Sequence, residues 1–211
     1  MNKVFLYLYP IEEFSKTFFL GNDFYDENNI KRPFEILNET IQKRYRDKGY
    51  QVVFALYPDK EVFGVVPQHE DKIIFTDITF KDASGYYENG TKKTDNEVKY
   101  PNEQFLISQL GNIEELVIGG YHAQDCVKRV GEVALSNGIN TLVDLDLTDL
   151  FFNLYRQNDY FKIDSYDPER FRNYMIEKAS RYGQEFAESL FNRNYQSSAY
   201  GFNNSNKHKK I

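Results

Sequence analysis

The feature that most constrains the fold of this chain is an unbroken apolar run at residues 4–9, which Pro10 ends. Such a run is typical of a strand buried on both faces of a parallel sheet. A helix is expected from Pro33, because apolar residues then recur every three or four positions before Gly49, at Phe34, Leu37, Ile41 and Tyr45. A second strand is expected at residues 51–56, where Gln51 precedes five apolar residues. It completes a βαβ unit with a right-handed crossover, so the sequence predicts an α/β fold.

The second half of the chain repeats this alternation after an irregular excursion. Residues 72–80 look extended, and Asn89-Gly90 predicts a tight turn. We then expect a short helix between Pro101 and Gly111, a strand at 116–118, a helix that starts near Cys126, and a strand at 140–145. The expected architecture is a three-layer sandwich, in which helices flank a mostly parallel, doubly wound, Rossmann-like sheet.

The C-terminal part predicts a helical extension. Asp167 is a suitable N-cap for a helix that starts at Pro168, and one apolar stripe runs through Phe171, Met175, Tyr182, Phe186 and Leu190. From Asn194 onward the sequence is polar and has no period, which predicts disorder. We therefore expect one α/β domain at 1–160, a helix packed on it at 161–193, and a disordered tail at 194–211.

Composition excludes several classes of function. The net charge is −6 and basic residues are scattered, so nucleic acid is not an expected partner. The apolar runs fall far short of the roughly 20 residues that a membrane helix needs, so no membrane span is expected. A lone cysteine excludes an intrachain disulfide, and no secretion signal is apparent, which predicts a cytoplasmic protein.

The lone cysteine, Cys126, opens a helix that follows a strand and the Gly119-Gly120 turn. Unpaired N–H groups and the helix dipole would stabilise a thiolate or an oxyanion at this place. Cys126 is also in helical register with Val130 and Val133, which is the pattern of a small residue packed in a core. The local sequence therefore supports two interpretations, a reactive thiol and a structural one.

Residues 101–150 resemble the isochorismatase-like cysteine hydrolases, which include nicotinamidases and related amidases. In that family a strand ending in glycine leads through a short turn to a Cys-Val pair that opens a helix. A small-residue run, a glycine and a strand with an acidic end follow. The matching positions in this chain are Gly120, Cys126-Val127, Ala134, Gly138, Leu142-Val143 and residues 144–148.

The resemblance implies that the Cys126 thiolate attacks a small amide or related C–N substrate, and that water then hydrolyses the acyl-enzyme. It also implies an oxyanion site at the backbone amides of Cys126 and His122, the latter following a cis bond between Tyr121 and His122. No cofactor is expected. No metal is expected either, because the histidines lack the ligand spacing of the metal-binding members: His69, His122 and His208.

The chain departs from the family pattern at the base. Where the family has an aspartate after its first strand, this sequence has Tyr9. A tyrosine with a pKa near 10 is a poor base at neutral pH. Glu12 or Glu13 would substitute for the aspartate if the following loop turned inward.

The family also has a lysine before the helix that precedes the cysteine strand. Lys99 is the first candidate for this position, and Lys92 or Lys93 would serve if the connection were longer. A cation near the sulfur would lower the pKa of the thiol.

Three functions follow from these observations. The first is a cysteine hydrolase with Cys126 as nucleophile and Lys99 beside the thiolate. The second is a degenerate member that binds a ligand or acts as a regulatory protein, with Tyr9 filling the pocket and the C-terminal helix offering a surface for a homo-oligomer. The third is a nucleotide-binding domain with a phosphate at Gly119-Gly120, for which the glycine fingerprint is incomplete.

Overall fold

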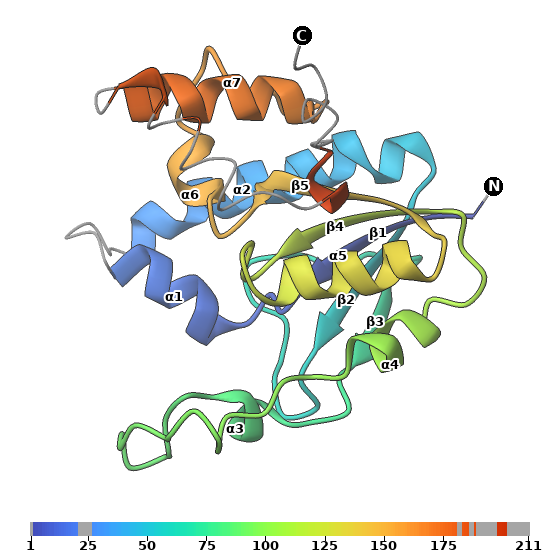
Figure 1. Cartoon of the computed structure of the whole chain (residues 1–211), viewed down its shortest axis with the longest axis vertical. Helices are drawn as coiled ribbons and strands as arrows, with labels where there is room; N and C mark the ends of the chain where they lie inside the picture. The colour runs from blue at the N-terminus through green and yellow to red at the C-terminus, as the bar shows by residue number, and fades with distance from the viewer. Residues whose placement is uncertain (1, 21–26, 181–182, 186–187, 189–197, 202–211) are drawn as a thin grey trace, which may run out of the picture.

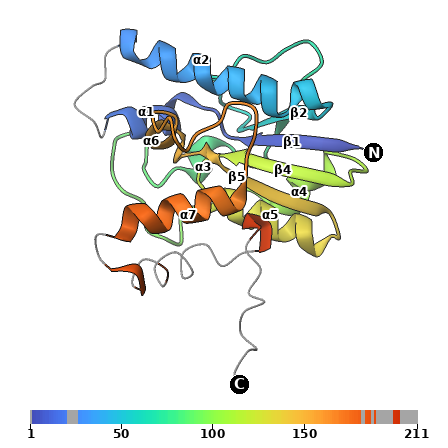
Figure 2. The same cartoon turned by 90° about the horizontal axis from the view of Figure 1, so that it is seen from above.

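The computed structural model describes residues 2–20, 27–180, 183–185, 188 and 198–201. Five strands in this part of the chain form an all-parallel sheet in the order β3-β2-β1-β4-β5. The strands are β1 (Lys3–Leu8), β2 (Gln51–Leu56), β3 (Lys72–Phe75), β4 (Glu115–Gly120) and β5 (Asn140–Thr148). Figure 2 shows the sheet between α2 on one side and α5 on the other, which confirms the predicted three-layer α/β sandwich.

The helices connect the strands and cover both faces of the sheet. The α-helices are α1 (Glu12–Leu20), α2 (Glu27–Arg44), α3 (Phe80–Ala83), α4 (Glu103–Ser108), α5 (Cys126–Ser136), α6 (Phe151–Leu154) and α7 (Pro168–Ala179), with short 3₁₀ helices η1 (Arg46–Lys48) and η3 (Ser198–Tyr200). Helices α6 and α7 contact β5 (Figure 1). None of the helices in the described ranges is both long enough and apolar enough to cross a membrane.

The apolar runs form the three central strands. In β1, β2 and β4 every residue after the first is buried, because helices cover both faces of an all-parallel sheet. Phe5 of β1 stacks on Tyr45 at the end of α2, with ring centroids 3.8 Å apart. At the end of β4, Gly120 adopts a φ of +98°, and a Cβ there would lie 2.1 Å from the Leu8 carbonyl oxygen. Glycine at this position therefore lets β4 end against β1.

The N-terminal helices differ from the prediction. Helix α1 occupies residues that the sequence suggested as a loop, and α2 begins at Glu27, six residues before Pro33. The first turns of α2 are polar, so they carry no apolar period that would reveal them. Tyr182, Phe186 and Leu190 of the predicted apolar stripe lie outside the described residues.

Part of the stretch expected to be a disordered tail is folded. Ala199 and Tyr200 in η3 are fully buried. A Cβ at Gly131 of α5 would lie 3.0 Å from the Ala199 Cβ, so the missing side chain lets η3 pack closely on α5. The two buried residues Ala199 and Tyr200 anchor this turn. The segment is too short to show a hydrophobic periodicity, so the sequence pattern did not predict it. Residues 194–197 and 202–211 lie outside the described part of the chain.

A buried charge cluster joins the end of α2 to β5. One Arg44 Nη atom donates to both Asp144 carboxylate oxygens at 3.0 and 2.8 Å, and the other donates to Asp146 at 2.9 Å. The Arg44 side chain is 2% exposed and both carboxylates are 0% exposed. The Tyr45 hydroxyl donates to Asp144 at 2.5 Å, and the Tyr160 hydroxyl donates to Asp146. Two carboxylates thus share one guanidinium and two hydroxyl donors in the protein interior.

We predict that Arg44→Met lowers the free energy of unfolding by about 3–5 kcal/mol, because it leaves two buried carboxylates without their cation. Lys43→Met is the control, because Lys43 is the neighbouring residue and is exposed. It should change the free energy of unfolding by less than about 0.5 kcal/mol. Urea denaturation measures both, and equal losses in the two variants would contradict the prediction. Adding Asp144→Asn and Asp146→Asn to Arg44→Met should recover part of the loss.

The same cluster predicts a pH dependence. Burial, together with the charge of Asp144, raises the pKa of Asp146 to about 6, above the roughly 3.9 expected in the unfolded chain. The folded state then binds the proton more tightly, so this group's contribution to stability is present below about pH 4 and is lost as the pH rises through about 6. As the pH rises from about 4 to about 6, the free energy of unfolding should therefore fall in the natural protein relative to that of the Asp146→Asn variant. A constant difference between the two proteins in urea denaturation would refute this assignment.

Candidate functional site at the carboxyl edge of the sheet

The strand order places a topological switch point between β1 and β4. From β1 the chain proceeds to β2 on one side, and β4 then pairs with the other side of β1. In open α/β sheets, ligands bind at such a point, outside the carboxyl ends of the strands. Tyr9 follows β1 here, and Tyr121 and His122 follow β4 before the chain enters α5 at Cys126.

Cys126 is the first residue of α5 and is partly exposed. The pKa of its thiol is raised to about 12, chiefly by burial and then by the charge of Asp125. Arg129 and the backbone amide of Cys126 lower this pKa, whereas Glu103 raises it. Burial thus outweighs the helix N-terminus, and the thiol is protonated at neutral pH.

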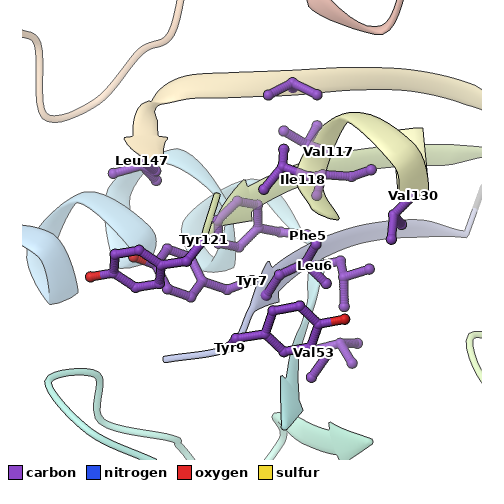
Figure 3. Close-up of a cluster of buried hydrophobic side chains, with 14 of the residues drawn as sticks. Phe5, Leu6, Tyr7, Tyr9, Val53, Val117, Ile118, Tyr121, Val130 and Leu147 are labelled. Carbon is purple, nitrogen blue, oxygen red and sulfur yellow. The ribbon is translucent and has the colours of Figure 1, made fainter. Parts of the chain in front are cut away.

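Tyr9 adopts a left-handed backbone conformation with a φ of 54°, which is uncommon for a residue with a large side chain. Figure 3 shows its ring beside Leu6 and Val53, away from the rings of Tyr7 and Tyr121. Tyr9 is 1% exposed and lies near enough to Cys126 for a charge on the sulfur to raise the pKa of the Tyr9 hydroxyl. Burial raises the pKa of Tyr9 well above its ordinary value, so the hydroxyl stays protonated.

Aromatic rings fill the space around Tyr9. We call this set the edge cluster, and it consists of Tyr9, Phe14, Tyr57, Phe80, Tyr121 and His122. Tyr9 stacks on Tyr57 with centroids 4.7 Å apart, and Phe14 meets the His122 ring at 4.8 Å and the Phe80 ring at 5.6 Å. The ring centroids of Phe14 and Tyr121 are 6.0 Å apart. This contact joins the segment that follows β1 to the segment that follows β4.

The turn between β4 and α5 is held from both sides. The peptide bond between Tyr121 and His122 is cis, as the resemblance implied. The Ala123 amide donates to the Asp149 carboxylate at 2.7 Å, and the Ala123 carbonyl accepts from the Tyr200 hydroxyl of η3. Burial lowers the pKa of His122, so its imidazole is uncharged at neutral pH.

Two other residues proposed from the sequence lie elsewhere. Glu12 is the first residue of α1, is exposed, and pairs with Lys16 at 2.6 Å. Lys99 is 65% exposed, and its ammonium faces Asp82 at 3.6 Å. Neither is among the groups that most affect the pKa of the thiol. The structure therefore brings Tyr9, His122 and Cys126 together, but it does not show Glu12 or Lys99 with them.

The alternative lysines also have other contacts. Lys93 is buried, and its ammonium donates to the Lys81 carbonyl at 2.5 Å and lies over the Tyr87 ring. Lys92 is exposed and lies in an antiparallel bridge with Tyr86.

Arg129 is the cation that lowers the pKa of the Cys126 thiol, which is the role that the resemblance assigns to a lysine. The sequence analysis did not propose Arg129. Its guanidinium pairs with Glu103 of α4 and lies 4.3 Å from the centroid of the Tyr100 ring. A spacing of three residues from Cys126 places Arg129 one helical turn away, and this spacing was the available sequence signal. Its charge is offset by Glu103, which limits its effect on the thiol.

Close packing between strands explains the Gly119-Gly120 pair without a bound phosphate. A Cβ at Gly119 would lie 3.0 Å from the Leu147 carbonyl oxygen, and Gly120 contacts β1 as described above. Both glycines therefore allow neighbouring strands to approach closely. In the described part of the chain, no group of three or more histidine, cysteine, aspartate or glutamate side chains is placed to hold a metal ion.

We predict that iodoacetamide alkylates Cys126 slowly, with a rate that rises about tenfold per pH unit and shows no plateau up to about pH 10. Asp125→Asn should lower the apparent pKa and speed alkylation, whereas Arg129→Met should slow it, because these charges act on the thiolate. Lys128→Met is the matched control, since Lys128 pairs with Glu132. A plateau below about pH 8.5 in the folded protein would contradict the prediction.

Comparison with known proteins gives this chain no family assignment. A scan against protein-family models found no match, and a search of curated proteins found no significant relative.

Proposed function

We propose that this chain is a catalytically degenerate relative of the isochorismatase-like cysteine hydrolases, which binds a small molecule at the carboxyl edge of the sheet without turning it over. The observation that carries this proposal is Tyr9. It stands where the resemblance calls for an aspartate, it is buried, and it lies near Cys126. An aromatic ring thus occupies the position of the expected base.

The chemistry of the thiol supports binding without turnover. Hydrolysis needs one group that takes the thiol proton and one that protonates the leaving nitrogen, and each such role contributes about 10²- to 10⁴-fold. The carboxylates that most affect the thiol, Asp125 and Glu103, raise its pKa. Tyr9 is kept neutral by burial and cannot act as a base at neutral pH.

The groups near the thiol favour an uncharged ligand. The imidazole of His122 is neutral, the Cys126 thiol is protonated, and Arg129 is paired with Glu103. Phe14 and His122 are both partly exposed. A planar, uncharged molecule would pack against these two rings with little loss of hydration.

We predict that a panel of small aromatic amides gives no product and no acyl adduct on Cys126 by intact-mass spectrometry. An amide that binds should protect Cys126 from alkylation, and Cys126→Ser should retain its affinity. Phe14→Ala should weaken binding about tenfold, whereas Phe105→Ala, at an exposed phenylalanine of α4, should leave it unchanged.

The alternative function is an active cysteine hydrolase, and the same experiment tests it. The observation in its favour is the place of Cys126 at a helix N-terminus, where its own backbone amide lowers the pKa of the thiol. Product formation that disappears in Cys126→Ser, together with a mass increase at the thiol, would replace our proposal with that function.

A further inference from the structure

The short helix η3 packs behind the turn that joins β4 to α5. Its residues Ala199 and Tyr200 are both fully buried. Figure 2 shows η3 between α5 and α7, and η3 also contacts β5. A Cβ at Gly131 of α5 would lie 3.0 Å from the Ala199 Cβ, and one at Gly201 would lie 3.0 Å from the Cγ of Pro168, the first residue of α7. The backbone of η3 and the residue after it therefore lies close to both helices.

Ala123, in the middle of the β4–α5 turn, has partners on both of its peptide groups. It is 2% exposed. Its N–H donates to the Asp149 carboxylate at 2.7 Å, and its carbonyl accepts from the Tyr200 hydroxyl. A buried carbonyl that loses its donor carries the cost of desolvation without compensation. The Tyr200 hydroxyl is thus a direct contact through which η3 acts on this turn.

The position of Ala123 determines where two residues of the candidate site lie. His122 precedes it, and the His122 ring meets the Phe14 ring at 4.8 Å. The His122 carbonyl accepts from the amides of the two residues that flank Cys126, at 3.1 and 3.2 Å, so the turn runs directly into the first residues of α5. A movement of the Ala123 peptide would therefore move the His122 ring and the Cys126 thiol together.

We propose that Tyr200 is a positioning residue of the candidate site, whose hydroxyl holds the Ala123 peptide and with it the whole β4–α5 turn. His122 and Cys126 thereby keep the arrangement that a ligand meets. The inference rests on the proposed function where it concerns the ligand, whereas the effect on the turn needs no ligand. Linkage is reciprocal, so a ligand bound against the His122 ring should in turn strengthen the packing of η3.

The first test needs no ligand and uses Tyr200→Phe in the full chain. This variant keeps the buried ring and removes only the donor to Ala123, so the turn should open more often. Hydrogen exchange of the amides at residues 122–127 and alkylation of Cys126 by iodoacetamide at about pH 8 should each become about fivefold faster, which corresponds to one ordinary hydrogen bond. Burial is the main cause of the high pKa of the thiol, so an open turn also favours the reactive thiolate.

Tyr160→Phe is the matched control. Tyr160 is also a buried tyrosine, but its hydroxyl donates to Asp146 in the charge cluster and not to the turn. Its loss should lower the midpoint of urea unfolding at least as much as Tyr200→Phe does, and it should leave the alkylation of Cys126 unchanged. The pair of variants thus separates positioning of the turn from a general loss of stability.

Gly131→Ala tests the same contact from the side of α5. The added Cβ would crowd Ala199 and displace η3, whereas alanine in place of glycine makes the helix itself more stable. Alkylation of Cys126 should again be faster than in the natural protein, in spite of the more stable helix. This variant leaves the Tyr200 side chain intact, so it carries the test if Tyr200→Phe does not fold.

The ligand provides a separate measurement. An amide that protects Cys126 in the natural protein should bind about fivefold more weakly to Tyr200→Phe and equally well to Tyr160→Phe. If no amide binds, the proposed function fails, and exchange and alkylation still decide the role of Tyr200. Unchanged exchange at residues 122–127 and unchanged alkylation in folded Tyr200→Phe, or an equal change in Tyr160→Phe, would overturn the inference.

Discussion

The pairing of Arg44 with Asp144 and Asp146 is the interaction on which the arrangement of this fold depends most. It connects the last residue of α2, in the first half of the chain, to the last strand of the sheet. The helix covers one face, and β5 forms the edge beyond β4. Since Tyr160 also donates to Asp146, the same cluster fixes the segment that leads to α7. One guanidinium therefore sets the relative positions of α2, β5 and the C-terminal helix.

Burial has opposite consequences for the charged cluster and for the thiol. In the cluster, each buried charge has a partner of opposite sign or a hydroxyl donor, so ionised groups are retained inside the protein. At Cys126, the charge of Asp125 raises the pKa of the thiol, and Arg129, which lowers it, is already paired with Glu103. The protein interior thus keeps the thiol neutral. The chemistry that the sequence resemblance suggests would need the reverse arrangement, with a cation near the sulfur and the acids farther away.

The central strands and the Cys126 helix were predictable from the sequence because their patterns are local. Residues 4–9, 52–56 and 116–118 are apolar without interruption, and Gly119-Gly120 marks the end of a strand. The partners of Arg44 were not predictable, because Asp144 lies 100 residues away. The start of α2 has too few apolar residues in register to be recognised. Helix α1 does carry apolar residues at helical spacing, Phe14 and Phe18, but it is only 9 residues long, so the period is too short to stand out. The same limit applies to the site at Phe14, which meets Tyr121 and His122 only through tertiary packing, whereas Arg129 lies one helical turn from Cys126 and carried a signal in the sequence.

The central position of β1 has a consequence for how the protein is made. Lys3 pairs with Glu115, and the opposite edge of the same strand pairs with β2. A ribosome adds about 5–20 residues per second, so the first strand waits on the order of 10 s before its second neighbour exists. During that time one edge of an apolar strand is open to other chains. Newly made chains would then rely on chaperones more than the mature protein does, and faster translation would shorten this exposure.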